Sequence, residues 1–253
     1  MIKKRNLLLR IGAFFLALFI AAFLLFITNS LVGNPISAAI AKNAIKDYVN
    51  RNYANLHLTM SNAAYNFKFG EYLIHASSSS STDTNFTIYY RRNGNIYDDY
   101  AYRVTEKGNT QRRMEEEYSA LVKSLLSSLD DLQQNTSMVL LSEKNYNPSK
   151  LQLDMPFDRA LFPDAEITIR VDLKDTSLSN IARILEEAYQ LLHQNGCSFQ
   201  QYHLFSQSNG ILVMIDQITP DMIENGNLTE LLQNALNRED SEKPSVVIKV
   251  FGN

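Results

Sequence analysis

A long apolar run near the N-terminus constrains this chain more than any other feature. The 21 residues from Leu7 to Ile27 include a single charge, Arg10, near the start of the run, where a long side chain can reach the interface. A helix needs about 20 such residues to cross a bilayer core. Three basic residues at positions 3–5 precede the run, so the positive-inside rule predicts a cytoplasmic N-terminus and an extracytoplasmic remainder.

A cleaved signal peptide, a lipoprotein and a buried core helix are the alternatives to a membrane anchor. A cleaved signal peptide has a shorter apolar core and a small-residue cleavage site, and residues 27–30 (Ile-Thr-Asn-Ser) offer no clear site of that kind. A lipoprotein needs a cysteine just after the run, but the single cysteine is Cys197. A buried core helix would have a visible polar face, which the run lacks. We therefore expect a signal anchor that remains attached.

The composition and charge of the chain exclude several classes of protein. With 45% hydrophobic and 20% charged residues the chain is neither collagen-like nor fully disordered, and one cysteine excludes a disulfide framework. Residues 1–33 carry four basic groups and no acid, residues 34–109 carry 8 basic and 6 acidic groups, and residues 110–253 carry 12 and 21. This acidic bulk would repel phosphate backbones, so we expect no nucleic-acid partner.

The first folded segment is predicted to be a helix followed by four antiparallel strands. Asn34-Pro35 is typical of an N-cap with proline at the first helical position, and an apolar stripe continues to about Asn52. Asn93-Gly94 is a strong hairpin signal. We expect an architecture similar to cystatin-like and PepSY-like domains, with strands at residues 56–67, 72–77, 84–91 and 96–104.

A long helix is predicted next, over residues 110–134, from apolar residues at steps of three and four. Residues 135–165 are mixed, with a short apolar piece at residues 138–141. From residue 166 onward the pattern gives strand, helix, hairpin, helix and strand. The helices are expected to begin after Ser177 and Thr219, with a restart at an Asn227–Glu230 capping box. This βαββαβ order predicts a ferredoxin-like split βαβ pattern, with strands at residues 166–173, 199–206, 211–218 and 246–251.

Together these patterns predict an α+β protein on one transmembrane helix. Residues 1–33 form the cytoplasmic foot and anchor, and residues 34–109 a membrane-proximal domain. Residues 110–165 form a linking helix and loop, and residues 166–253 a distal domain. Each of the two α+β domains is long enough to bury its own core.

Three short segments, preceded by Asn34-Pro35, carry a resemblance to a known family. They read Tyr-Asn-Phe-Lys-Phe-Gly-Glu-Tyr at residues 65–72, Ser-Thr-Asp-Thr-Asn-Phe-Thr-Ile at 81–88 and Gly-Asn-Ile-Tyr-Asp-Asp-Tyr at 94–100. In these segments the chain resembles the YfjL-like family of Firmicutes, well over roughly residues 30–105 and in outline elsewhere. The resemblance implies a membrane-anchored protein of a Gram-positive cell envelope. It brings no assigned activity and no catalytic residues.

The sequence lacks the motifs of common catalytic sites. G-x-x-x-x-G-K-[ST], G-x-S-x-G, H-E-x-x-H, S-x-x-K and C-x-x-C do not occur. The four histidines show no metal-ligand spacing, and a zinc site from His193 and His203 would need a third ligand. Cys197 follows a predicted helix C-terminus, so we expect a buried small apolar side chain rather than a nucleophile. We predict no metal and no cofactor.

A tyrosine-rich strand with two adjacent acids is the candidate binding site. The hypothesis is an aromatic, acid-rimmed surface for a peptide or glycan. Cross-strand aromatic pairs that stabilise the sheet are the competing interpretation. Neighbours in a strand point to opposite faces, so the two acids are not expected to converge as a glycosidase pair. The candidate residues are Tyr90, Tyr97, Asp98, Asp99, Tyr100 and Tyr102.

These observations lead to one functional hypothesis and two alternatives. The hypothesis is a single-pass cell-envelope protein whose extracytoplasmic part is a non-enzymatic interaction or regulatory module, able to accept a partner's strand or peptide at a sheet edge. One alternative is a cell-wall-associated hydrolase, which would need an acidic cleft. The other is a scaffold subunit of a membrane complex, whose apolar helix would pack on partner helices.

Overall fold

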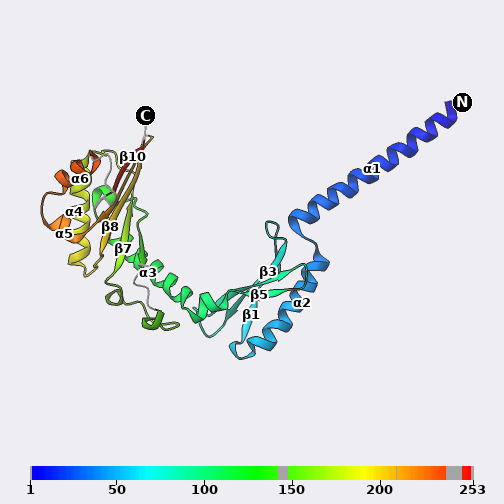
Figure 1. Ribbon diagram of the computed structural model, residues 1–253, viewed down its shortest axis with the longest axis horizontal. Helices are drawn as coiled ribbons and strands as arrows, with labels where there is room; N and C mark the ends of the chain where they lie inside the picture. Colours follow the sequence, from blue (N-terminus) through cyan, green and yellow to red (C-terminus); the bar gives the residue numbers. More distant parts are fainter. Residues whose placement is uncertain (1, 142–147, 209, 238–246, 252–253) are drawn as a thin grey trace. The chain divides into compact units, whose positions relative to one another are not determined.

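The computed structural model describes residues 2–141, 148–208, 210–237 and 247–251 (Figure 1). The chain divides into two compact units, residues 1–108 and residues 109–253. Each unit contains a mainly antiparallel sheet with helices packed on it. The predicted α+β class is therefore confirmed.

The first unit opens with helix α1 (Ile2–Val32), which contains the apolar run. At 1.5 Å per residue its 31 residues extend about 46 Å, more than the roughly 30 Å of a bilayer core. Every side chain from residue 11 to residue 32 is exposed, and Phe14, Phe19 and Leu25 are 66–71% exposed. Among the described residues, α1 contains the one span that is long and apolar enough to cross a membrane. The alternative of a buried core helix is therefore wrong.

Helix α2 (Pro35–Asn52) begins after only two non-helical residues, Gly33 and Asn34. The Oδ1 of Asn34 accepts a hydrogen bond from the Ser37 backbone N–H at 2.8 Å, and proline occupies the first helical turn. The predicted N-cap is thus confirmed. Three residues at helical spacing are buried on the side of α2 that packs on the sheet, namely Ala41, Ile45 and Val49.

The first sheet is an antiparallel meander packed against α2. Its order is β1-β3-β4-β5, and β2 also pairs with β3. Alternate residues of β3 and β4 are buried on one face, because successive side chains of a strand point to opposite faces; they are Tyr72, Ile74, Ala76, Phe86 and Ile88. The strands are β1 (Leu58–Met60), β2 (Ala64–Asn66), β3 (Glu71–Ser78), β4 (Asn85–Arg91) and β5 (Ile96–Asp98).

Two strands of this sheet differ from the prediction. The first is divided into β1 and β2, which pair with opposite ends of β3. The last ends at Asp98 instead of continuing to residue 104, because the Oδ1 of Asp98 accepts the Tyr100 N–H at 3.1 Å and turns the chain into a π-helical segment (Ala101–Thr105). The predicted hairpin forms with a four-residue loop, residues 92–95, in which Gly94 has a φ of 84°.

The second unit is a five-stranded sheet with the order β10-β9-β8-β7-β6. All neighbouring pairs are antiparallel except β7 and β8, which are parallel and joined through α4. Figure 1 shows α4, α5 and α6 together on one side of this sheet. The elements are α3 (Gly108–Leu126), β6 (Met138–Leu141), β7 (Ala165–Arg170), α4 (Leu178–Gln194), β8 (Gln201–Ser208), β9 (Ile211–Ile218), α5 (Pro220–Glu224), α6 (Leu228–Leu236) and β10 (Val247–Phe251).

The predicted βαββαβ order is present, but the ferredoxin-like split is wrong. In the observed sheet β8 lies directly beside β7, and β6 occupies the other edge of β7. No edge of β7 is therefore left for β9 or β10. The short apolar piece at residues 138–141, which the sequence pattern left unassigned, is the strand that closes this position.

Helix α3 belongs to the core of the second unit and ends at Leu126, before the predicted residue 134. Its side chains also bind the outer edge of β6. Ser119 Oγ accepts the Val139 N–H at 2.8 Å and Glu115 Oε1 accepts the Leu141 N–H at 3.1 Å. These bonds satisfy edge groups that could otherwise pair with another chain.

The helix caps of the second unit were predicted with mixed success. Ser177 caps α4 through Asn180, as expected. Asn227 precedes α6 but makes no side-chain cap bond, because its φ of −122° and ψ of 28° are not the extended conformation that capping requires.

Cys197 is fully buried, as predicted. The predicted turn residue Asn209 and the predicted strand start at residue 246 lie outside the described residues.

Candidate functional site

Asp98 ties the C-terminal end of α2 to the sheet. The Tyr48 and Tyr53 hydroxyls both donate to Oδ2 of Asp98, each at 2.7 Å. Burial, followed by the bond to Asp98 and its negative charge, raises the pKa of both tyrosines above the ordinary value of 10. With the Tyr100 N–H as the third donor, three of the roughly four lone-pair positions of this carboxylate accept hydrogen bonds from within the protein. Its geometry is that of a structural acceptor.

Asp99 points to a different set of partners. It accepts the Thr87 N–H at 2.6 Å, and Oδ2 pairs with the Arg103 guanidinium at 2.5 Å. The two adjacent acids do not share a partner, in agreement with the expectation that they would not converge on one substrate. Asp99 thus fixes the start of the π-helical segment against β4.

Of the other aromatic candidates, Tyr97 and Tyr100 pack against neighbouring rings, whereas Tyr102 is exposed. Tyr97 stacks on Tyr89 across the strand pair at 4.8 Å between ring centroids, and its hydroxyl donates to the buried Glu71 at 2.8 Å. Tyr100 packs against Tyr53, with ring centroids 4.8 Å apart. Tyr102 is 66% exposed. The Tyr97–Tyr89 pair is thus a cross-strand contact of the kind that the competing interpretation expects. Tyr100 follows the end of β5 and instead packs against Tyr53 at the end of α2.

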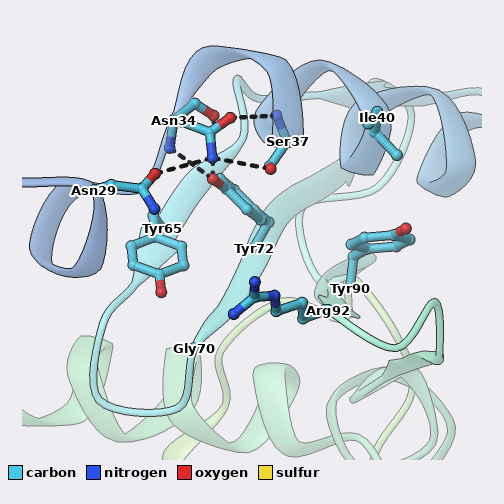
Figure 2. A pocket seen from close by; sticks show the side chains of 10 residues that line it. Asn29, Asn34, Ser37, Ile40, Tyr65, Gly70, Tyr72, Tyr90 and Arg92 are labelled. Atoms are coloured by element: carbon cyan, nitrogen blue, oxygen red, sulfur yellow. Dashed lines mark hydrogen bonds between the residues drawn. The ribbon is translucent and has the colours of Figure 1, made fainter. Parts of the chain in front are cut away.

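Tyr90 leads to a cavity that the sequence patterns did not predict. A pocket of about 220 Å³ lies where α1, α2 and the first sheet meet (Figure 2). We call it the junction pocket. The helices contribute five of its lining residues, which come from the last turn of α1, the joint and the first turns of α2: Asn29, Gly33, Asn34, Ser37 and Ile40.

Hydrogen bonds around Asn34 hold the helical side of the junction pocket together. The Tyr72 hydroxyl accepts from the Asn34 N–H at 2.9 Å and donates to the Asn34 carbonyl at 3.1 Å. The Nδ2 of Asn34 donates to Asn29 Oδ1 and to Ser37 Oγ, both at 3.0 Å. A Cβ on Gly33, whose φ is 76°, would lie 2.7 Å from the Tyr72 oxygen. The joint between α1 and α2 is therefore bonded directly to β3.

The sheet contributes the other side of the junction pocket through Tyr65, Gly70, Tyr72, Tyr90 and Arg92. Tyr65 and Tyr72 pack with ring centroids 5.0 Å apart. Arg92 lies in the β4–β5 loop and, in the view of Figure 2, on the opposite side of the pocket from Asn34. The ten lining residues include one cation and no acid, so the pocket presents positive charge and several hydrogen-bond donors.

The sequence contained signals for parts of this pocket but not for the whole. Asn34 was predicted as a cap, and the Asn93-Gly94 turn placed Arg92 beside a loop. Tyr65 and Tyr72 lie in one of the segments that carry the family resemblance. Nothing local to these segments predicts that a helix N-terminus, a β2–β3 hairpin and a β4–β5 loop meet in space.

The second unit contains a histidine between two acids on the sheet face opposite the helices. His203 Nε2 lies 3.6 Å from Glu166 Oε2, and Nδ1 lies 3.2 Å from Asp216 Oδ1. Within the described ranges, no group of three or more His, Cys, Asp or Glu side chains has an arrangement that could hold a metal ion. The zinc site considered for His193 and His203 on sequence grounds gains no support from this arrangement.

Fold and site together define a two-unit α+β protein with one N-terminal helix that is apolar enough to cross a membrane. Two family models match it: the YfjL-like N-terminal domain over residues 8–100 and the YfjL-like C-terminal domain over residues 117–233. The chain belongs to the YfjL-like family, as its resemblance predicted. No curated protein and no solved structure matches it.

Proposed function

We propose that the chain is a single-pass cell-envelope protein that works as a binding or regulatory module. Helix α1 anchors it, with residues 1–10 in the cytoplasm and both α+β units outside. The observation that carries this proposal is α1 itself, whose apolar side chains are exposed along residues 11–32 and need a lipid or protein environment. The basic residues at positions 3–5 give the direction of insertion.

The chemistry of the junction pocket supports binding rather than catalysis. Its lining has no carboxylate, imidazole or thiol, the groups that most often exchange protons or attack a substrate near neutral pH. Asp98 and Asp99, the acids that a hydrolase could have used, are engaged in hydrogen bonds and an ion pair within the sheet. A site with one cation and several neutral donors is suited to hold an anionic group.

Cysteine labelling of intact cells tests the orientation. The native Cys197 is fully buried, so it adds no background to a membrane-impermeant maleimide. Ser80→Cys, in an exposed loop of the first unit, is expected to be labelled on intact cells. The matched variant Lys3→Cys is expected to react only after permeabilisation. If Ser80→Cys stays unlabelled until the cells are opened, the proposed orientation is wrong.

Proximity labelling tests the interaction role. A ligase fused after residue 253 is expected to mark the same envelope proteins in replicate cultures. A control fusion that carries residues 1–33 alone should not mark them. If the two fusions label the same proteins equally, the α+β units do not select a partner and the module hypothesis fails.

A further inference from the structure

We propose that the junction pocket binds the phosphate of an anionic lipid headgroup at the membrane surface. This inference rests on the proposed anchoring by α1 and adds a ligand class to it. Asn29, which lines the pocket, is two residues beyond Ile27, the end of the apolar run. Along a helix that distance is about 3 Å. With α1 in a bilayer, the pocket is at the depth of the headgroups.

Arg92 supplies the charge that recognises the phosphate. Its neighbour Arg91 pairs with Glu71 and lies over the Tyr97 ring, so that guanidinium is already engaged. Arg92 has no carboxylate partner among the described residues, and the pocket lining contains no acid. A guanidinium binds phosphate oxygens through two parallel N–H bonds. Tyr65 and Tyr90 line the same cavity, and each side chain carries a hydroxyl group.

Exposed apolar side chains beside the pocket favour a lipid over a soluble anion. Phe67 and Phe69 are 65% and 67% exposed on the β2–β3 turn, whose Gly70 lines the pocket. Lys68 between them places its Nζ 5.6 Å from the Phe69 ring. Ile36, in the first turn of α2, is 74% exposed. Aromatic and basic side chains of this kind are enriched at the membrane interface, where rings contact acyl chains and cations contact phosphates.

The absence of acid from the lining also predicts which lipids bind. Phosphatidylglycerol has a net negative charge, and Arg92 is the one charged side chain of the lining that its phosphate would contact. Phosphatidylcholine has a phosphate of the same kind but adds an ammonium group, which no carboxylate of the pocket can neutralise. We therefore expect the anionic lipid to bind more tightly than the zwitterionic one.

Native mass spectrometry of the full-length protein in detergent tests the site. Short-chain phosphatidylglycerol, short-chain phosphatidylcholine and inorganic phosphate are added separately to the wild type, Arg92→Gln and Arg51→Gln. Both arginines are exposed and without a carboxylate partner among the described residues, and Arg51 is in the last turn of α2, away from the pocket. The wild type and Arg51→Gln should retain phosphatidylglycerol, and Arg92→Gln should lose affinity about tenfold or more.

Every other outcome refutes the proposed binding of an anionic lipid in the junction pocket, each for a different reason. Equal retention of phosphatidylglycerol by Arg92→Gln and wild type would show that the pocket is not the site. Stronger retention of phosphatidylcholine would indicate ammonium recognition by the tyrosine rings. Binding of inorganic phosphate as tight as that of the lipid would assign the pocket to a soluble anion. Alkaline extraction of membranes separates these failures from failure of the anchor: Arg92→Gln must stay in the membrane fraction, and release of the wild type refutes the anchor itself.

Discussion

Replacement of Asp98 by alanine should loosen the first unit while leaving the second unit unchanged. The substitution removes the acceptor of the Tyr48 and Tyr53 hydroxyls, both at 2.7 Å, and of the Tyr100 N–H. A hydrogen bond to a charged group contributes about 1.5–3 kcal/mol. These residues are partly exposed, so water can replace some of the lost bonds. We expect a loss of about 2–4 kcal/mol in total.

Hydrogen exchange with mass spectrometry measures this loss in each unit separately. A global denaturation curve would mix two units that need not unfold together. Local opening that becomes easier by about 2–4 kcal/mol accelerates amide exchange in α2 and β4 by about 30-fold to several hundred-fold. Amides of α4, in the other unit, should exchange at the wild-type rate.

Asp47→Ala is the matched control, because Asp47 is an exposed acid on α2 with no hydrogen bond or ion pair among the described residues. It should change the opening free energy by less than about 0.5 kcal/mol. If α2 and β4 exchange at the wild-type rate in Asp98→Ala, the carboxylate does not hold the helix to the sheet. The hypothesis of a binding role for Asp98 would then regain its place.

Three further predictions concern the joint, the β6 edge and the titration of Tyr53. Gly33→Ala should destabilise the α1–α2 joint by about 2 kcal/mol or more, because residue 33 has a positive φ and the new Cβ would lie 2.7 Å from the Tyr72 oxygen. The Asn34 amide should then exchange faster than in the wild type, and an unchanged exchange rate contradicts the prediction. Ser119→Ala should leave the Val139 N–H without its acceptor at 2.8 Å and weaken the β6 edge by about 1–2 kcal/mol. Exchange of that amide measures the loss, and Ser124→Ala, at an exposed position of α3, is the control. The pKa of Tyr53 is higher in the folded protein than in the unfolded chain. Its contribution to the free energy of unfolding is therefore complete below pH 10 and is lost as the pH rises from 10 toward the folded pKa. Absorbance at 295 nm during alkaline titration should show delayed tyrosine ionisation in the wild type and a smaller delay in Tyr53→Phe.

Local signals in the sequence predicted most of the helices and hairpins. Asn34 acts through a side-chain bond to a residue three positions away, and Pro35 and Gly94 act through their own backbone conformation. Their effects are therefore visible without the rest of the fold. The last strand of the first sheet was predicted too long, because the turn depends on the side chain of Asp98 reaching the Tyr100 N–H. The alternation of apolar and polar residues, from which the strand was predicted, gives no information about such a bond.

Long-range pairing was the part that the sequence could not supply. The position of residues 138–141 beside β7 depends on α3, whose Ser119 and Glu115 bind the outer edge of that strand. Asp98 meets Tyr48 and Tyr53 across 50 and 45 residues, so its structural role was invisible in its own segment. The junction pocket also depends on contacts between distant segments, and Tyr90 is the one predicted site residue that lines it.

The two-residue joint between α1 and α2 limits the reach of the first unit. Gly33 and Asn34 could span at most about 7 Å even if fully extended, and their bonds to Tyr72 remove that freedom. A flexible linker would let the unit sample a wide volume at low local concentration. A bonded joint instead confines it to a shallow layer over the bilayer to which α1 would anchor it. Ligands that diffuse in the plane of the membrane would then meet this unit far more often than ligands in bulk solution.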